Sequence, residues 1–275
     1  MRGKSVMARI MAAPHVLWSV LFILAPLVFV LYYAFTDRNG NFTLSNIKQL
    51  GSANYVDIFI RSASFALAAT AICLLVAYPL AYAVSRAKPG SQKFYIMLIM
   101  LPMWMNFLIR TYSIMAIIED TGFLNSMLRA LGLSPVHMIN TAGAVIFGMV
   151  YNYLPYMVLP IYTVLSKLDR RLFEAAADLG CTPAQTFFKV VMPLSTSGVV
   201  SGITMVFVPS VSTFYISQKL GGGNFDLIGD TIERQFQSAY NYNLGAAMSL
   251  VLMIIILVSM AIMNRYSDNE GGIVA

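Results

Sequence analysis

The sequence predicts an all-α membrane protein with six transmembrane helices. Of its 275 residues, 58% are hydrophobic and only 11% are charged, which is too apolar for the surface of a soluble globular protein. Six apolar stretches are long enough to cross about 30 Å of hydrocarbon. They run approximately over Pro14–Phe35, Ser64–Val84, Phe94–Ile117, Ala142–Leu165, Ser195–Tyr215 and Gly245–Met263.

The distribution of Lys and Arg predicts the topology. The net charge of +6 is also compatible with nucleic-acid binding, but the basic residues lie in short loops beside the spans, which favours membrane topology and no nucleic acid. On one side they are Arg2, Lys4, Arg9, Arg86, Lys88, Lys93, Lys167, Arg170, Arg171, Lys189 and Arg265. Both termini and residues 166–193 are therefore expected in the cytoplasm.

The order of the spans gives a domain organisation. Residues 1–12 form a cytoplasmic tail, residues 13–60 the first span and an outer loop, residues 61–265 a core that contains the loop 166–193, and residues 266–275 a second tail. The first apolar run resembles a signal peptide because basic residues precede it. Its length and Pro26 within it favour a retained anchor.

Prolines interrupt most of the predicted spans. Each removes a backbone donor, and such breaks are tolerated at membrane depth where neighbouring helices or a watery cavity satisfy the freed carbonyls. They are Pro26, Pro79, Pro102, Pro155, Pro160 and Pro209. A single kink indicates only packing, but the set favours a bundle with an internal pathway. Gly198 and Gly202 form a GxxxG pattern, which allows another helix to approach closely.

Polar and aromatic residues at membrane depth are candidates for a substrate pathway, because each polar group there is costly unless it has a partner. They are Trp104, Asn106, Arg110, Tyr151, Asn152, Tyr153, Tyr156 and Tyr215. Aromatic rings would attract a cationic substrate by about 0.5–2 kcal/mol each. The same rings are also typical of interface belts or packing. Arg110 has two further interpretations: it reaches the outer interface, or it pairs with Glu119 or Asp120.

Two features are expected in the outer loops. Asp230 and Glu233 are spaced as an N-cap and an acid three residues later, which predicts a short helix through Ala239. His137 stands alone in an outer loop and is expected to be solvated. Acidic residues in these loops would attract a polycation, although ordinary solvated loops have the same composition.

The loop 166–193 carries its own helix signals. Asp169 is placed to cap a helix that runs to about Asp178, and Gly180 suits the left-handed residue that ends it. Thr182 and Gln185 flank Pro183 in the pattern of a second helix start. One side of the pair is apolar: Leu172, Phe173, Ala176, Phe187, Phe188, Val190 and Val191. This pattern indicates a ligand for a groove on another protein, or a helix that lies on lipid headgroups.

The same loop resembles the EAA loop of permeases of type I ABC importers. The matching residues are Glu174, Ala175, Ala176, Gly180 and the run Val190-Val191-Met192-Pro193, in which Val190 and Met192 depart conservatively from the family pattern. Residues 101–113, 148–180 and 214–236 also resemble the B-type permease subunits of spermidine/putrescine importers. The resemblance implies a six-span type I ABC importer permease (MetI-like) fold with a cytoplasmic coupling helix.

This resemblance implies a non-catalytic subunit that moves polyamines into a bacterial cytoplasm. Glu174, Ala175, Ala176 and Gly180 would lie in the coupling helix, with Asp178 on its polar side. The implied partners are a homologous second permease, an ABC ATPase dimer, and an extracellular or periplasmic polyamine-binding protein.

The motifs that the sequence lacks bear on cofactors and on alternative functions. The sequence has no GxxxxGK[ST] phosphate loop and no His/Cys metal cluster, so ATP and Mg²⁺ are expected on the partner ATPase and no cofactor on this chain. The nearest alternative function is a type I ABC importer permease for ferric iron, thiamine or a phosphonate. A secondary carrier is disfavoured because no Asp or Glu lies deep in a span.

Overall fold

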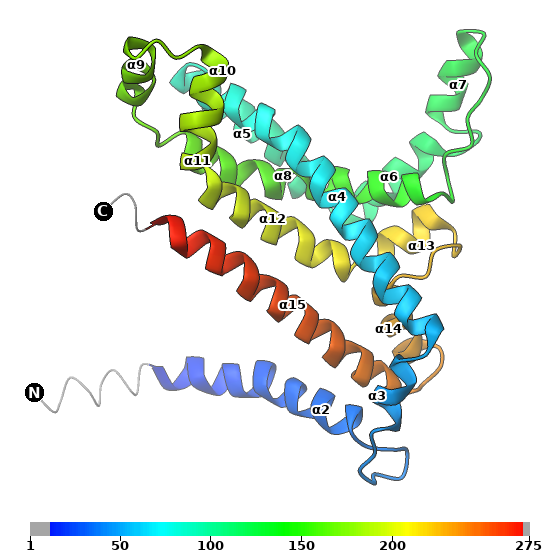
Figure 1. Cartoon of the computed structure of the whole chain (residues 1–275). Coiled ribbons are helices and arrows are strands. Elements are labelled where there is room, and N and C mark those ends of the chain that lie inside the picture. Colours follow the sequence, from blue (N-terminus) through cyan, green and yellow to red (C-terminus); the bar gives the residue numbers. More distant parts are fainter. Residues whose placement is uncertain (1–11, 272–275) are drawn as a thin grey trace, which may run out of the picture. The chain divides into compact units, whose positions relative to one another are not determined.

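The computed structural model describes residues 12–271, and these are almost entirely helical (Figure 1). Within this range no strand forms, and a single isolated antiparallel bridge joins Thr36 to Phe42. The predicted all-α class is therefore confirmed. Most of the basic N-terminal tail that was used to predict topology lies outside the described residues.

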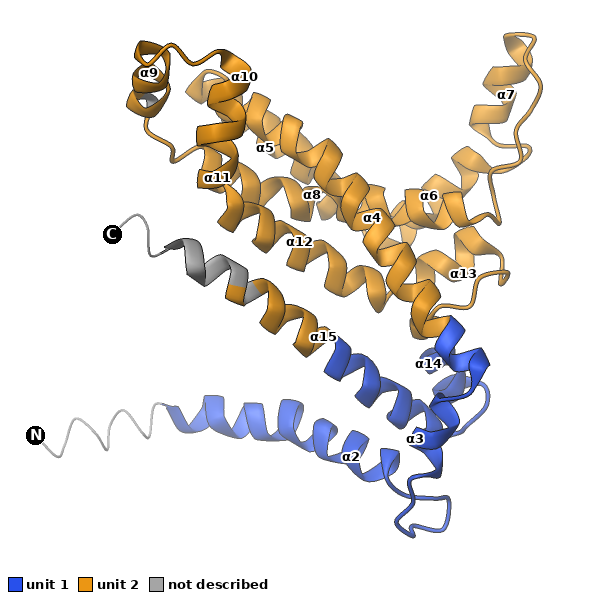
Figure 2. Cartoon of the chain, in the orientation of Figure 1, with its two compact units in different colours: residues 1–57, 231–255 blue, residues 58–230, 256–275 orange. Residues whose placement is uncertain are grey.

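The chain divides into two compact units (Figure 2). Unit 1 comprises residues 1–57 and 231–255, and unit 2 comprises residues 58–230 and 256–275. The predicted domain bounds, which follow the order of the spans, stay a prediction.

Unit 1 is built around the end of the first span. A π-helical turn, η1 (Val20–Leu24), leads into α2 (Ala25–Ala34), and α3 (Ser45–Leu50) follows after a loop. The last carbonyls of a helix have no partner within it. Here two asparagine amides supply donors: Asn46 Nδ2 bonds the Ala34 oxygen at 3.1 Å, and Asn243 Nδ2 bonds the Thr36 oxygen at 2.7 Å.

Unit 2 holds the helices of the predicted core, with α8 at its centre. These are most of α4 (Ala53–Arg86), then α5 (Pro89–Trp104), α6 (Phe107–Ile118), α7 (Phe123–Ala130), α8 (Ala142–Leu165), α9 (Arg170–Asp178), α10 (Pro183–Thr186), η2 (Phe187–Val191), α11 (Met192–Leu194), α12 (Thr196–Val211) and α13 (Tyr215–Gly221). Five large side chains of α8 are fully buried: Val145, Met149, Met157, Val158 and Ile161. Helices α14 (Ile228–Gln237) and α15 (Tyr242–Gly271) each contribute to both units.

The glycine pair of the fifth predicted span brings α12 directly onto α8. A Cβ atom added to Gly198 would lie 2.9 Å from the Pro160 carbonyl oxygen, and one added to Gly202 would lie 2.7 Å from the Met157 sulfur. Both positions thus have room only for hydrogen. The close helix approach predicted from this pattern is confirmed, and it is made within the chain.

The six predicted spans correspond to four continuous helices and two bent pairs. The continuous ones are Ala12–Ala34, Ala53–Arg86, Ala142–Leu165 and Tyr242–Met263. The third predicted span, which Pro102 interrupts, is sharply bent, since Pro89–Trp104 and Phe107–Ala130 meet at an angle of 93°. A second bend, of 64°, lies at the start of the fifth predicted span, between Pro183–Leu194 and Thr196–Val211. Six spans result when each bent pair is counted as one.

The third span breaks because two residues leave the helical conformation. Met105 and Asn106 have extended backbones, with ψ angles of 147° and 133°. Asn106 then acts as an N-cap, its side-chain oxygen accepting a hydrogen bond from the Leu108 N–H at 2.8 Å. Its carbonyl oxygen accepts the Arg110 N–H at 3.0 Å, which is the first backbone bond of α6.

Candidate functional site: the segment between α8 and α12

The segment 166–194 forms the two short helices that the sequence predicted. Asp169 caps α9 by accepting the Arg171 N–H at 2.9 Å, and Gly180 ends it with a φ of +78°. Thr182 and Gln185 then form a reciprocal capping box, with bonds of 2.9 and 3.3 Å. These local signals are confirmed because each resides in a few adjacent residues.

The residues that resemble the EAA loop differ in exposure. Glu174, Ala175, Asp178 and Gly180 are exposed, whereas Ala176 is buried. Glu174 lines a polar hollow of about 570 Å³ together with Ser85, Arg86, Pro89, Gln92, Leu165, Ser166, Leu168 and Phe173. The carboxylate thus lies at the surface, where it is available to donors of another protein.

The apolar side of the segment is not one surface. Phe173, Ala176, Phe187 and Val191 pack against the chain's own helices. Leu172 and Phe188 are exposed, as are two residues outside the predicted set, Leu179 and Met192. The prediction that all seven apolar residues form a single docking face was therefore wrong, since the ends of α4 and α8 already cover part of it.

Aromatic and cationic contacts attach the segment to α4. The Arg86 guanidinium carbon lies 4.3 Å from the centre of the Phe173 ring. The Phe187 ring lies edge-on to two tyrosines of α4, at centroid distances of 5.5 Å to Tyr78 and 5.3 Å to Tyr82. Neither tyrosine was singled out from the sequence, where they resembled ordinary residues of an apolar span.

The pathway candidates on α8 fall into two groups. Tyr151 and Tyr156 are partly exposed, whereas Asn152 and Tyr153 are buried within the chain. Asn152 Nδ2 bonds the Gly148 oxygen at 2.8 Å, and the Tyr153 hydroxyl bonds the Pro209 oxygen at 3.4 Å. The second pair therefore packs inside the bundle instead of on an exposed wall.

Arg110 has a structural role that the sequence did not indicate. Its side chain is 5% exposed, and Nη1 donates to the Pro102 carbonyl at 3.1 Å. Neither predicted alternative holds, since the Arg110 side chain is buried and, among the described residues, no ion pair joins it to Glu119 or Asp120. The cation instead lies at the C-terminal end of α5, where free carbonyls favour positive charge.

Tyr215 and Trp104 lie in different surroundings. The Tyr215 ring lies 6.1 Å from Phe107 and 6.0 Å from Tyr112, and Lys219 Nζ is 5.7 Å from its centre. Lys219 and Tyr112 were not identified from the sequence. Trp104 ends α5 and is 74% exposed.

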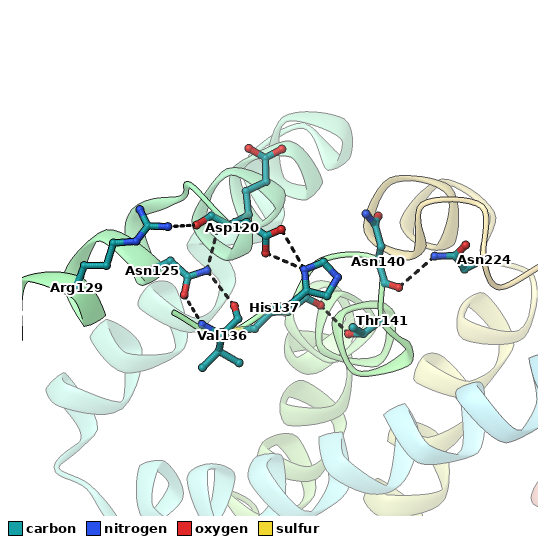
Figure 3. A network of polar contacts seen from close by, with 10 residues as sticks. Asp120, Asn125, Arg129, Val136, His137, Asn140, Thr141 and Asn224 are labelled. Atoms are coloured by element: carbon teal, nitrogen blue, oxygen red, sulfur yellow. Dashed lines mark hydrogen bonds and ion pairs between the residues drawn. The ribbon is translucent and has the colours of Figure 1, made fainter. Parts of the chain in front are cut away.

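The loop between α6 and α8 is held by a polar network (Figure 3). Asn125 bonds the Val136 backbone in both directions, at 2.9 and 2.8 Å. His137 is 61% exposed, as expected, and its Nδ1 lies 2.8 Å from the Asp120 carboxylate, a partner that the sequence did not indicate. Arg129 donates to the Asp120 carbonyl at 2.8 Å, which ties α7 to the same residue.

Asp230 is not the N-cap that the sequence predicted. The helix begins earlier, at Ile228, and the Asp230 carboxylate accepts the Leu227 N–H at 3.1 Å from the third helical position. Asp230 is 6% exposed, and its Oδ1 atom has no hydrogen-bond partner among the described residues. Burial raises the pKa of this carboxyl to about 6.

Known proteins resemble this chain in sequence over most of its length. Residues 5–269 match the family described as "Binding-protein-dependent transport system inner membrane component". The chain is 37% identical over 261 residues to the spermidine/putrescine transport system permease protein PotB of Haemophilus influenzae, covering 92% of this chain and 91% of that protein. It is 35% identical to PotB of Escherichia coli K12, covering 86% and 90%.

Two solved structures share the fold. The first is a bacterial ABC transporter involved in the import of alginate, with a TM-score of 0.78, 17% identity and coverage of 97% of this chain and 96% of that one. The second is the MetNI methionine ABC transporter in inward-facing conformations, with a TM-score of 0.59, 16% identity and coverage of 78% and 95%. The predicted type I ABC importer permease fold is thereby confirmed.

Proposed function

Because the chain belongs to the family of binding-protein-dependent transport system inner membrane components, we propose that it is the permease subunit of an ATP-driven importer of polyamines. The observation that carries the substrate class is its similarity, along most of its length, to permeases named for spermidine and putrescine. In this assignment it is a multi-pass protein of the bacterial inner membrane, with both termini and the segment 166–194 in the cytoplasm.

The proposed partner of that segment is an ABC ATPase dimer. Leu172, Leu179, Phe188 and Met192 are exposed apolar side chains, at 40, 83, 64 and 50%. They lie in the same segment as the exposed carboxylates of Glu174 and Asp178. Short amphipathic helices of this kind enter grooves on partner proteins. ATP and Mg²⁺ would be bound by that partner, and this chain would bind no cofactor.

The proposed pathway face includes a groove between α8 and α12. Its lining is Tyr156, Leu159, Pro160, Thr163, Val164, Ser197, Gly198, Ser201 and Met205, around a volume of about 440 Å³. An aromatic ring and several hydroxyls would replace part of the hydration shell of an ammonium group. A homologous second permease would close the pathway from the other side. A binding protein outside the membrane would deliver the polyamine.

Reconstitution tests this proposal. The chain would be placed in proteoliposomes with the homologous second permease, the ATPase and the binding protein. ATP hydrolysis would then be measured with a panel of ligands. We expect spermidine or putrescine to stimulate hydrolysis and to accumulate inside, and thiamine, ferric iron and an organic phosphonate to do neither. Stimulation by one of the other ligands alone would refute the polyamine assignment and leave the importer assignment standing.

A further inference from the structure

The bend in the fifth span is centred on a buried serine. Ser195 lies between α11 and α12, at the point where the axis turns by 64°, and its side chain is fully buried. A break of this kind leaves backbone carbonyls without helical donors. Ser195 Oγ bonds the Met192 carbonyl at 3.0 Å, and Thr196 Oγ1 bonds the Pro193 carbonyl at 2.9 Å. Hydroxyl groups therefore stabilise the bent form.

Tyr78 of α4 bonds this serine. The Tyr78 hydroxyl lies 2.6 Å from Ser195 Oγ. Ser195 Oγ also lies 3.0 Å from the Met192 carbonyl oxygen, so the two contacts connect Tyr78, Ser195 and Met192. These hydrogen bonds connect α4 to the bend across 117 residues of sequence.

A second contact connects the same tyrosine to the coupling segment. The Phe187 ring lies edge-on to Tyr78 at 5.5 Å, and Phe187 begins the π-helical turn η2. Wide turns of this kind are uncommon and occur often at functional sites. Pro79 follows Tyr78 inside α4 and lacks an N–H, so α4 has a weak point at this level. Tyr78 thus contacts both the segment and the bend at a point where α4 can flex.

We propose that Tyr78, Phe187 and Ser195 form a joint through which movement of the coupling segment is transmitted to α4 and α12. Tyr78 is a positioning residue that contacts no substrate. Its hydroxyl fixes the position of the bend at Ser195 relative to the segment. This inference rests on the proposed function, because it needs an ATPase that moves the segment. Without the hydroxyl, the segment moves while the two helices follow it less, and ATP is hydrolysed without transport.

The test is the number of spermidine molecules imported per ATP hydrolysed by the complete importer in proteoliposomes. Tyr78→Phe keeps the ring against Phe187 and removes only the hydroxyl. Ser195→Ala removes the other half of the bond, whereas Ser195→Thr keeps a hydroxyl. We expect the first two to lower the ratio about three- to tenfold, as the loss of one hydrogen bond predicts. Ser195→Thr should retain most of it.

The controls are Tyr95→Phe on α5 and Ser64→Ala on α4, both exposed residues outside the joint. They should leave the ratio unchanged. The double variant Tyr78→Phe/Ser195→Ala should be no worse than Ser195→Ala alone, because that single variant already removes the bond to Tyr78 together with the bond to the Met192 carbonyl. Additive losses, or an unchanged ratio in either single variant, would overturn the joint.

The design separates this inference from the proposed function. If the unaltered complex imports no spermidine with ATP, the proposed function fails. If it does import spermidine and Ser195→Ala retains the full ratio, only the joint fails. Should Tyr78→Phe not accumulate in membranes, the pair Ser195→Ala and Ser195→Thr still decides the question, because they differ in the presence of the hydroxyl.

Discussion

Arg110 donates a hydrogen bond to the carbonyl of Pro102 across the break between α5 and α6, at 3.1 Å. The two residues lie eight positions apart and are brought together only because the chain turns at Met105 and Asn106. The bond explains how a guanidinium can lie near the expected passage of a cationic substrate: its charge is directed at the end of α5.

Replacing Arg110 by Met should therefore destabilise the fold more than it alters substrate recognition. The Pro102 carbonyl would keep the Met105 N–H and lose its charged donor, and a hydrogen bond to a charged group contributes about 1.5–3 kcal/mol. We expect a lower thermal midpoint in detergent and less protein in the membrane, with an unchanged spermidine KM per assembled complex. Ser113→Ala on the exposed side of α6 is the control. A stable variant with a strongly altered KM would make Arg110 a substrate residue.

Gly180→Ala tests whether uptake depends on the conformation of the segment 166–194. Its φ is +78°, and a Cβ atom there would meet nothing within 4 Å, so Gly180→Ala adds backbone strain of about 1–2 kcal/mol without a clash. Uptake should fall strongly while the chain still inserts. Gly132 is a matched control, with a φ of +76° and equally open space, in the loop after α7. Equal losses from both variants would show that strain alone is responsible.

The local signals of this segment were predictable, and its packing was not. Asp169, Gly180 and Thr182 act on residues within a few positions, so spacing alone identifies their roles. Whether Phe187 or Phe188 faces the bundle depends on α4, more than a hundred residues earlier. Propensity and spacing carry no information about such distant partners.

The break in the third span was partly visible in the sequence. Pro102 followed by Asn106 is a helix-ending signal followed by an N-cap residue, but the apolar run on both sides favoured one continuous span. Arg110 then finds its partner through the bend, which no pairing by sequence distance predicts. Ser195 gave no signal, since serine is common inside apolar helices.

Trp104 tests the proposed pathway. Trp104 and Leu101 lie on α5 and are 74% and 47% exposed. If the indole contacts a polyamine, Trp104→Ala should raise the spermidine KM by a factor that corresponds to about 0.5–2 kcal/mol. Leu101→Ala should change it less. Uptake assays with both variants at equal expression make the comparison, and equal KM values would leave Trp104 outside the pathway.

Asp230 should make stability depend on pH. Burial raises the pKa of its carboxyl from 3.8 in the unfolded chain to about 6 in the folded one. The folded state therefore binds the proton more tightly, and the contribution of Asp230 to stability is greatest below about pH 4 and is lost as pH rises through about 6, by about 3 kcal/mol at most. This contribution should lower the thermal midpoint of the unaltered chain between about pH 4 and 6. Asp230→Asn should lose this component, and an identical slope in both would refute it.

The central claim is that an ATPase contacts this chain through the segment between α8 and α12. A photo-crosslinker at Leu179, which is 83% exposed, tests it in the assembled importer, with the same group at Leu131 after α7, 66% exposed, as the control. We predict a covalent adduct with the ATP-binding subunit from Leu179 and none from Leu131. An adduct from Leu131 alone, or labelling of Leu179 only by reagents outside the cell, would contradict the claim.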